Sequence, residues 1–345
     1  MTVLYPRAPY PGAKNSLTDI GGLLVGNAQD ARVRSGTTVI LCEPGLRATA
    51  AVQVRGGGPG TRETDALAPG GLVGSVDAVV LSGGSAYGLD AAGGVHAWLG
   101  SQGRGYDVGK HRVPIVPSAI LYDLSHGGDK DWGEEPPYRR LGREAALAAG
   151  SDFALGKAGA GYGARAGSLE GGLGSVSAVD PVTGATVAAI VAVNSFGETT
   201  GDDGLFFAAP FERDGEFGGL GPSPNPANPE PAFAKLDSGI AAGRTNTTIA
   251  VVATDARLDH NDTHRMAVMA EAGFARAIRP IFTPYDGDTV FALSTGRGPV
   301  VDLIGLCRLG AIAADCLARA IARGIYEATG TTDWPVWRER HGQSR

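Results

Sequence analysis

Short apolar stretches rich in β-branched residues alternate along this chain with Gly-rich turns, and a few longer stretches carry helical periodicity. The apolar stretches predict strands over 37–42, 50–54, 78–81, 119–124, 174–179, 186–193, 247–254 and 289–293. Small-residue or amphipathic patterns predict helices over 89–99, 138–149, about 262–277 and 300–326, with Asn261 or Asp262 as candidate N-cap of the third. Residues 201–231 are rich in Gly, Pro, Asp and Glu without periodicity, which is typical of an exposed linker.

One strand, 247–254, begins in an unusual way, because the polar residues Asn246 and Thr247 lead directly into a very apolar run. If the backbone broke between these two residues, Thr247 would become an N-terminus with an α-amine of pKa about 7.7–8.0. That amine could take the hydroxyl proton as Thr247 attacks, which is how N-terminal threonine nucleophiles are activated. An Asn-Thr pair at a strand start is also ordinary turn chemistry, so this stretch alone leaves both interpretations open.

Two aspartates, Asp286 and Asp288, stand two positions apart just before the strand at 289–293. In extended backbone both carboxylates project to one face, and two like charges that close repel unless a cation lies between them. The amine of a processed Thr247 would be such a cation. A Gly-containing turn with two solvated aspartates is the simpler alternative.

Two Gly-rich segments invite a functional interpretation. Gly83 and Gly84 follow a predicted strand and precede a predicted helix, where backbone N–H groups can meet an anion or a developing oxyanion, although this connection is common. Gly159, Gly161 and Ala164 satisfy a G-x-G-x-x-A pattern. No convincing strand precedes that pattern and a β pattern follows it, which argues against a dinucleotide site.

Composition narrows the classes of function. The 345 residues carry a formal net charge of −6 and no Lys/Arg run, so we expect no nucleic-acid surface. No apolar run reaches the roughly 18 residues of a membrane span, and the N-terminus lacks the apolar run of a signal peptide. The three cysteines have neither metal-site spacing nor an even count, which favours reduced thiols and a cytoplasmic location. The 54 glycines, roughly twice the usual share, indicate many tight turns in a layered α/β or β-rich fold.

Several short motifs follow one another between about residue 17 and residue 328. They are Leu17–Ile20, Gly58–Asp65, Ser82–Leu89, Gly159–Gly161, Asn194, Asn246–Thr248 and Asp286–Asp288. In this order the chain resembles the autoprocessed L-aminopeptidase/D-Ala-esterase-amidase family, which includes β-peptidyl aminopeptidases and nylon-oligomer (6-aminohexanoate oligomer) endo-hydrolases. The Asn-Thr-Thr and Asp-Gly-Asp motifs are most similar to the nylon-oligomer hydrolase branch, whereas many relatives carry a Ser nucleophile and a Ser/Glu pair.

The resemblance implies a fold and a processing event. The fold would be a four-layer αββα sandwich of the N-terminal-nucleophile-hydrolase type, with residues 1–345 as a single catalytic domain. Self-cleavage before the nucleophile would give an α chain, 1–246, and a β chain, 247–345. The two chains would stay together, usually in a homotetramer.

The same resemblance implies roles for particular residues. Thr247 would be the nucleophile, and Asn194 the donor to the oxyanion or the substrate amide. Tyr122 would turn its hydroxyl toward the reacting group. Asp286 and Asp288 would hold the Thr247 amine and tune its basicity.

Two further points concern the pocket. Backbone N–H groups near Gly83 and Gly84 are candidates to complete it. The nylon-hydrolase branch has a Lys just after its Gly-rich loop, whereas Ser168 stands at that position here. Either Arg165 or Lys157 substitutes for that Lys, or its role is dispensable.

The predicted function is hydrolysis of amide bonds in 6-aminohexanoate oligomers or similar small amides through an acyl-enzyme, with no metal or organic cofactor. An alternative keeps the chemistry and changes the substrate to peptides and amides with an N-terminal D-amino acid or β-amino acid. Two alternatives differ in class. One is a dinucleotide-dependent enzyme that uses the second Gly-rich segment, and the other is an unprocessed, inactive relative.

Overall fold

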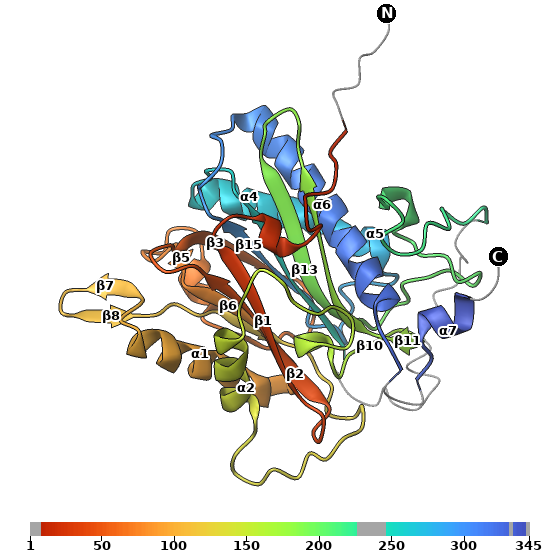
Figure 1. Ribbon diagram of the computed structural model, residues 1–345, viewed down its shortest axis with the longest axis horizontal. Helices are drawn as coiled ribbons and strands as arrows, with labels where there is room; N and C mark the ends of the chain where they lie inside the picture. The colour runs from red at the N-terminus through yellow and green to blue at the C-terminus, as the bar shows by residue number, and fades with distance from the viewer. Residues whose placement is uncertain (1–7, 226–245, 331–333, 343–345) are drawn as a thin grey trace, which may run out of the picture.

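Two β-sheets lie face to face between two layers of helices in the computed structural model, which describes residues 8–225, 246–330 and 334–342 (Figure 1). Three apolar clusters fill the three spaces between these four layers. The predicted αββα sandwich is therefore the architecture of the described chain. No helix among the described residues is both long enough and apolar enough to cross a bilayer.

The first sheet has five strands in the order β1-β2-β6-β9-β4. Their bounds are Leu23–Asp30 (β1), Ser35–Cys42 (β2), Ala78–Ser82 (β6), Ser118–Ile120 (β9) and Thr61–Arg62 (β4). Helices α1 (Asp90–Ser101) and α2 (Tyr138–Leu147) cover its outer face, where Val39 and Val80 pack with Leu99 and Leu141.

The second sheet has six strands in the order β12-β13-β14-β15-β3-β5. Their bounds are Gly172–Val179 (β12), Thr186–Asn194 (β13), Thr247–Thr254 (β14), Thr289–Ser294 (β15), Ala48–Val54 (β3) and Ser75–Val76 (β5). Helices α4 (His260–Ala270), α5 (Ala272–Ala277) and α6 (Leu303–Tyr326) cover its outer face. Strand β14 pairs antiparallel with β13 and parallel with β15, so it lies in the interior of the sheet.

The continuous apolar run of β14 follows from burial on both faces. Val251 points into the cluster between the sheets, whereas its neighbours Ala250 and Val252 belong to the cluster beneath the helices. All eight residues of the strand are buried. Both ends of β14 are therefore fixed by packing, and the polar residue at its start is held in place.

The remaining elements are small. Strands β7 (Tyr106–Val108) and β8 (His111–Val113) form a hairpin, β10 (Arg165–Ala166) pairs with β11 (Leu169–Glu170), and α7 (Trp337–His341) lies near the C-terminal end.

Three predictions about local structure need correction. The segment predicted as an exposed linker buries Phe206 and Phe217 against α6 and α7 over its described part, so its sparse aromatic residues anchor it; residues 226–231 lie outside the described residues. Asp259, not Asn261 or Asp262, caps α4, because its side chain accepts a hydrogen bond from the backbone N–H of Asp262 at 2.8 Å. The strand predicted over 119–124 ends at Ile120.

Candidate active site

The start of β14 and the end of β13 bring two predicted site residues together. Thr247 is the first residue of β14, and Asn194, the last residue of β13, is its cross-strand partner. Thr247 is 4% exposed and Asn194 is fully buried. The antiparallel register between two apolar strands thus places a hydroxyl and a carboxamide side by side, where β14 begins and β13 ends.

The two predicted aspartates lie at the same end of these strands. The loop before β15 runs parallel to the start of β14, and Asn246 forms a parallel bridge with Asp286. Asp288 Oδ1 accepts a hydrogen bond from the backbone N–H of Thr248 at 2.7 Å. Asp286 Oδ1 accepts one from the backbone N–H of Phe196, in the segment that follows β13, at 3.2 Å. The loop therefore joins β13, β14 and β15 around the bond between Asn246 and Thr247.

Burial makes this pair of carboxyl groups electrostatically unusual. Asp286 and Asp288 both have no exposed surface. Burial raises the pKa of the Asp288 carboxyl well above its usual range, and the nearby charge of Asp286 raises it further. An ammonium group beside the pair would lower that pKa again. The nitrogen of Thr247 is the backbone nitrogen immediately before the Thr248 nitrogen that Asp288 already contacts.

The glycine between the two aspartates contacts the same peptide bond. The backbone N–H of Gly287 donates to the carbonyl oxygen of Asn246 at 3.0 Å, and Thr247 Oγ1 donates to that oxygen as well. A Cβ at position 287 would lie 2.8 Å from Thr247 Oγ1. Only glycine lets the loop come this close. Sequence reasoning gave Gly287 no role, although a glycine between two aspartates just before a predicted strand was an available signal.

The carboxamide of Asn194 is held from two sides. Its Nδ2 donates to the backbone carbonyl of Tyr122 at 3.0 Å, and its Oδ1 accepts from the backbone N–H of Arg165 at 2.9 Å. These two bonds fix the orientation of the carboxamide; that Asn194 donates to the oxyanion or the substrate amide stays a prediction. Tyr122 contributes its carbonyl group to this arrangement; that its hydroxyl faces the reacting group stays a prediction.

The N–H groups of Gly83 and Gly84 have other partners. Gly83 donates to the carbonyl of Gly36 at 2.8 Å, and Gly84 donates to Asp123 Oδ1 at 2.8 Å. Asp123 is fully buried, and burial raises the pKa of its carboxyl group. This differs from the prediction that these N–H groups complete the pocket, because both already donate hydrogen bonds, one to a carbonyl of β2 and one to the Asp123 carboxyl group.

Comparison with known proteins shows what the chain is related to. Residues 15–334 match the model of peptidase family S58. The chain belongs to this family. It is 44% identical to an uncharacterized aminopeptidase of Mycobacterium tuberculosis, over 94% of this chain and 97% of that protein. It is 30% identical to a 6-aminohexanoate-oligomer endohydrolase of Kocuria sp., over 88% of this chain and 84% of that protein.

The fold is also similar to a solved structure, that of the L-aminopeptidase D-Ala-esterase/amidase from Ochrobactrum anthropi, which is described as a variant of the Ntn hydrolase fold. The TM-score is 0.66 at 20% identity, over 98% of this chain and 97% of that one. The predicted fold class is therefore confirmed. Membership of family S58, together with the aminopeptidase relatives, makes the protein an amide-bond hydrolase.

This S58 chain has a serine, not a lysine, at position 168. The structure shows the contacts of Lys157 and Arg165, the two residues that could replace that lysine. Lys157 forms a buried ion pair with Glu170, with Nζ and Oε2 2.6 Å apart. The guanidinium of Arg165 lies over the ring of Trp334, 4.8 Å from its centroid. Ser168 donates through its hydroxyl to the Glu198 carboxylate at 2.9 Å. Each cation thus has a structural contact of its own.

The second Gly-rich segment packs as a short turn. Gly159–Gly161 is a 3₁₀ turn, and the N–H of Ala160 donates to Thr38 Oγ1 of β2 at 3.0 Å. Strand β10 follows it, so the strand–turn–helix geometry of a dinucleotide site is missing there. Among the described residues, no three His, Cys, Asp or Glu side chains are placed to hold a metal ion.

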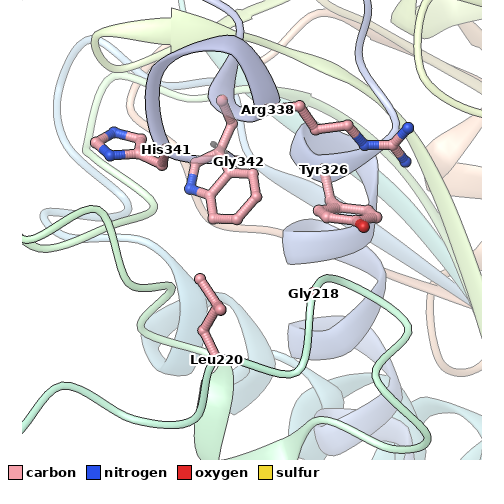
Figure 2. A pocket seen from close by; sticks show the side chains of 7 residues that line it. Gly218, Leu220, Tyr326, Arg338, His341 and Gly342 are labelled. Carbon is pink, nitrogen blue, oxygen red and sulfur yellow. The ribbon is translucent and has the colours of Figure 1, made fainter. Parts of the chain in front are cut away.

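A cavity of about 220 Å³ lies between α7, the C-terminal part of α6 and the segment around Leu220 (Figure 2). Figure 2 shows Tyr326, Arg338 and His341 around it. None of its lining residues belongs to the group around Thr247. We assign it no part in the amide chemistry.

Proposed function

We propose that this S58 protein cleaves its own chain between Asn246 and Thr247 and then hydrolyses amide bonds with Thr247 as an N-terminal nucleophile. The observation that carries this proposal is the position of the Thr247 hydroxyl. It contacts the Asn246 carbonyl and belongs to the residue paired with Asn194 on the neighbouring strand. It also lies beside a loop with two buried aspartates.

The proposed mechanism has two stages. In the first, Thr247 Oγ1 attacks the Asn246 carbonyl, and an N-to-O acyl shift followed by hydrolysis releases the α-amine. In the second, that amine takes the hydroxyl proton as Oγ1 attacks a substrate amide, while Asn194 donates to the oxyanion. Asp286 and Asp288 hold the ammonium form between turnovers. An acyl-enzyme forms, the amine product leaves, and water completes the hydrolysis without a metal or organic cofactor.

The proposed substrates are 6-aminohexanoate oligomers or similar small amides. The 30% identical endohydrolase and the Thr and Asp-Gly-Asp motifs support this choice. The name of the 44% identical relative, an uncharacterized aminopeptidase, favours a second candidate, an aminopeptidase. Its proposed substrates are peptides and amides with an N-terminal D-amino acid or β-amino acid. Comparing kcat/KM on 6-aminohexanoate oligomers with that on D-alanine amide and a β-dipeptide separates the two, and activity confined to the latter substrates would exclude the first.

Two broader expectations accompany this function. The three cysteines are free thiols, which supports the proposed cytoplasmic location. We also propose assembly into a homotetramer, and the exposed apolar side chains of Val300, Leu303 and Ile304 at the start of α6 support association with copies of the same chain.

The decisive test is the intact mass of freshly purified protein under denaturing conditions. We expect two chains of 246 and 99 residues, which together make the 345 of the full sequence. The Thr247→Ala variant should remain one chain and should lack amidase activity. A wild-type chain that stays intact on incubation would remove the free amine, and the proposed mechanism with it.

A further inference from the structure

The Asp286–Asp288 loop contains a backbone group that touches the bond to be cleaved. We propose that the N–H of Gly287 is the oxyanion donor of self-cleavage. This inference rests on the proposed function, since it concerns the processing of the same bond. It adds a catalytic group that is independent of the side chains of Asp286 and Asp288.

The donor has the geometry that such a role requires. An effective oxyanion donor lies about 2.7–3.1 Å from the oxygen on which charge develops. The nitrogen of Gly287 lies 3.0 Å from the carbonyl oxygen of Asn246. Asn246 is 2% exposed and Thr247 is 4% exposed, so the contact is shielded from water and is stronger than it would be at the surface.

The nucleophile meets the same carbonyl group. Thr247 Oγ1 contacts the Asn246 oxygen, so the attacking hydroxyl and the N–H of Gly287 converge on one peptide group. A Cβ at position 287 would lie 2.8 Å from Thr247 Oγ1 and 2.9 Å from the carbonyl oxygen of Gly58. Any side chain there would displace the nucleophile or lengthen the hydrogen bond, which explains glycine at this position.

The loop is held in this position before reaction. The N–H of Gly58 donates to the carbonyl of Asp286 at 2.8 Å, and the N–H of Arg55 donates to the carbonyl of Asp288 at 2.9 Å. The first bond holds the peptide unit that carries the Gly287 N–H, and the second holds the loop where it enters β15. The donor is therefore oriented in advance and needs no rearrangement as charge develops.

Self-cleavage needs only groups of the chain and one water molecule. The bond from Thr247 Oγ1 to the Asn246 carbonyl carbon forms, and the carbonyl electron pair moves to the oxygen that accepts from Gly287. The bond from that carbon to the Thr247 nitrogen then breaks, and the nitrogen keeps the electron pair and receives the proton that the hydroxyl gave up. Water hydrolyses the resulting ester to the Asn246 carboxylate and the free hydroxyl of Thr247.

The test removes one N–H without changing a side chain. Cell-free translation with glycolic acid at position 287 replaces that amide by an ester. The matched control is the same replacement at Gly161, whose buried N–H donates to the carbonyl of Ala158 at 2.9 Å, outside the Asp286–Asp288 loop. The appearance of the chain that begins at Thr247 is followed by intact mass. We expect cleavage to slow about 10²–10³-fold for the ester at 287 and to stay within about threefold of wild type for the ester at 161.

Each outcome is informative. Wild-type cleavage by the Gly287 ester, or equal slowing by both esters, would overturn this inference and leave the proposed function intact. An uncleaved wild type would overturn both. If the Gly287 ester does not fold, Gly287→Ala serves instead, with Gly21→Ala as control because no atom lies within 4 Å of a Cβ there. Cleavage of Gly287→Ala at the wild-type rate would likewise contradict the geometry.

Discussion

The protonation state of the buried Asp288 should depend on whether the bond before Thr247 has been cleaved. Before cleavage, the nitrogen of Thr247 is a neutral amide, and burial together with the charge of Asp286 favours the protonated form of Asp288. After cleavage, an ammonium group would lie beside the pair and favour the ionised form. The uncleaved chain should therefore be less stable at neutral pH than at mildly acidic pH as far as Asp288 is concerned.

This effect can be measured in the uncleaved Thr247→Ala variant. An unfolded Asp has a pKa of about 3.9, whereas that of folded Asp288 is higher. Above the unfolded value the unfolded state binds fewer protons than the folded state. The free energy of unfolding should therefore fall as pH rises, by up to about 1.4 kcal/mol per pH unit, until the folded pKa is passed.

Urea unfolding of Thr247→Ala and of Thr247→Ala/Asp288→Asn from pH 5 to pH 8 isolates the contribution of Asp288. Asp123 is common to both proteins, so its effect cancels in the difference, which reports Asp288 together with its electrostatic coupling to Asp286. The single variant should lose more stability with rising pH than the double variant. Parallel pH profiles would mean that Asp288 titrates as it does in the unfolded chain.

The resemblance to the family singled out Thr247, Asn194 and the two aspartates, and the sequence shows each of them where a predicted strand begins or ends. The sequence could not place them together, since the register between β13 and β14 depends on both strands and on the layers around them. Backbone donors were harder still. Only the folded loop determines which N–H donates to the Asn246 carbonyl, so Gly287 was not predicted. Gly84 was predicted to line the pocket, but its N–H donates to Asp123.

At the scale of elements, the continuously apolar strands and the long helices were predictable. Strand β1, in which Asn27, Gln29 and Asp30 interrupt the apolar pattern, and the short strands were not predicted. Strand β14 was predicted with its observed bounds because eight buried residues give a continuous signal. Strands β4, β5, β10 and β11 have two residues each and show no periodicity. Helix α6 begins three residues later than predicted because Asp302 caps it, accepting from the N–H of Gly305 at 2.8 Å.

Close approach between elements depends on particular glycines. A Cβ at Gly174 in β12 would lie 1.9 Å from the carbonyl oxygen of Ala320 in α6, so the helix could not keep its present distance from the sheet. Gly174→Ala should therefore lower the free energy of unfolding by about 1–3 kcal/mol. Urea unfolding checks this against Gly21→Ala, whose effect should stay within about 0.5 kcal/mol. Equal stability of the two variants would show that α6 moves away without cost.

For the whole molecule, the proposed cleavage site divides the sequence but not the fold. Strand β14 would begin the β chain, yet it pairs with β13 of the α chain along its full length. Strand β15 of the β chain pairs with β3 of the α chain. Helix α6, seen in blue in Figure 1, packs with β12 and β13 in one apolar cluster. Each chain would thus supply faces that the other must cover.

This interleaving predicts that the two chains remain associated after cleavage. Separation would expose the inner strands of the second sheet and the apolar face of α6 together, a cost far above the marginal stability of a domain, about 5–15 kcal/mol. Size-exclusion chromatography with light scattering should show both chains in one peak at 35.1 kDa or a multiple of it. Denaturing mass spectrometry of that peak should show them apart. The β chain expressed alone should not fold, because β14 and β15 would lack β13 and β3 as partners; a monomeric, folded 99-residue β chain would contradict this account of the sandwich as one cooperative unit.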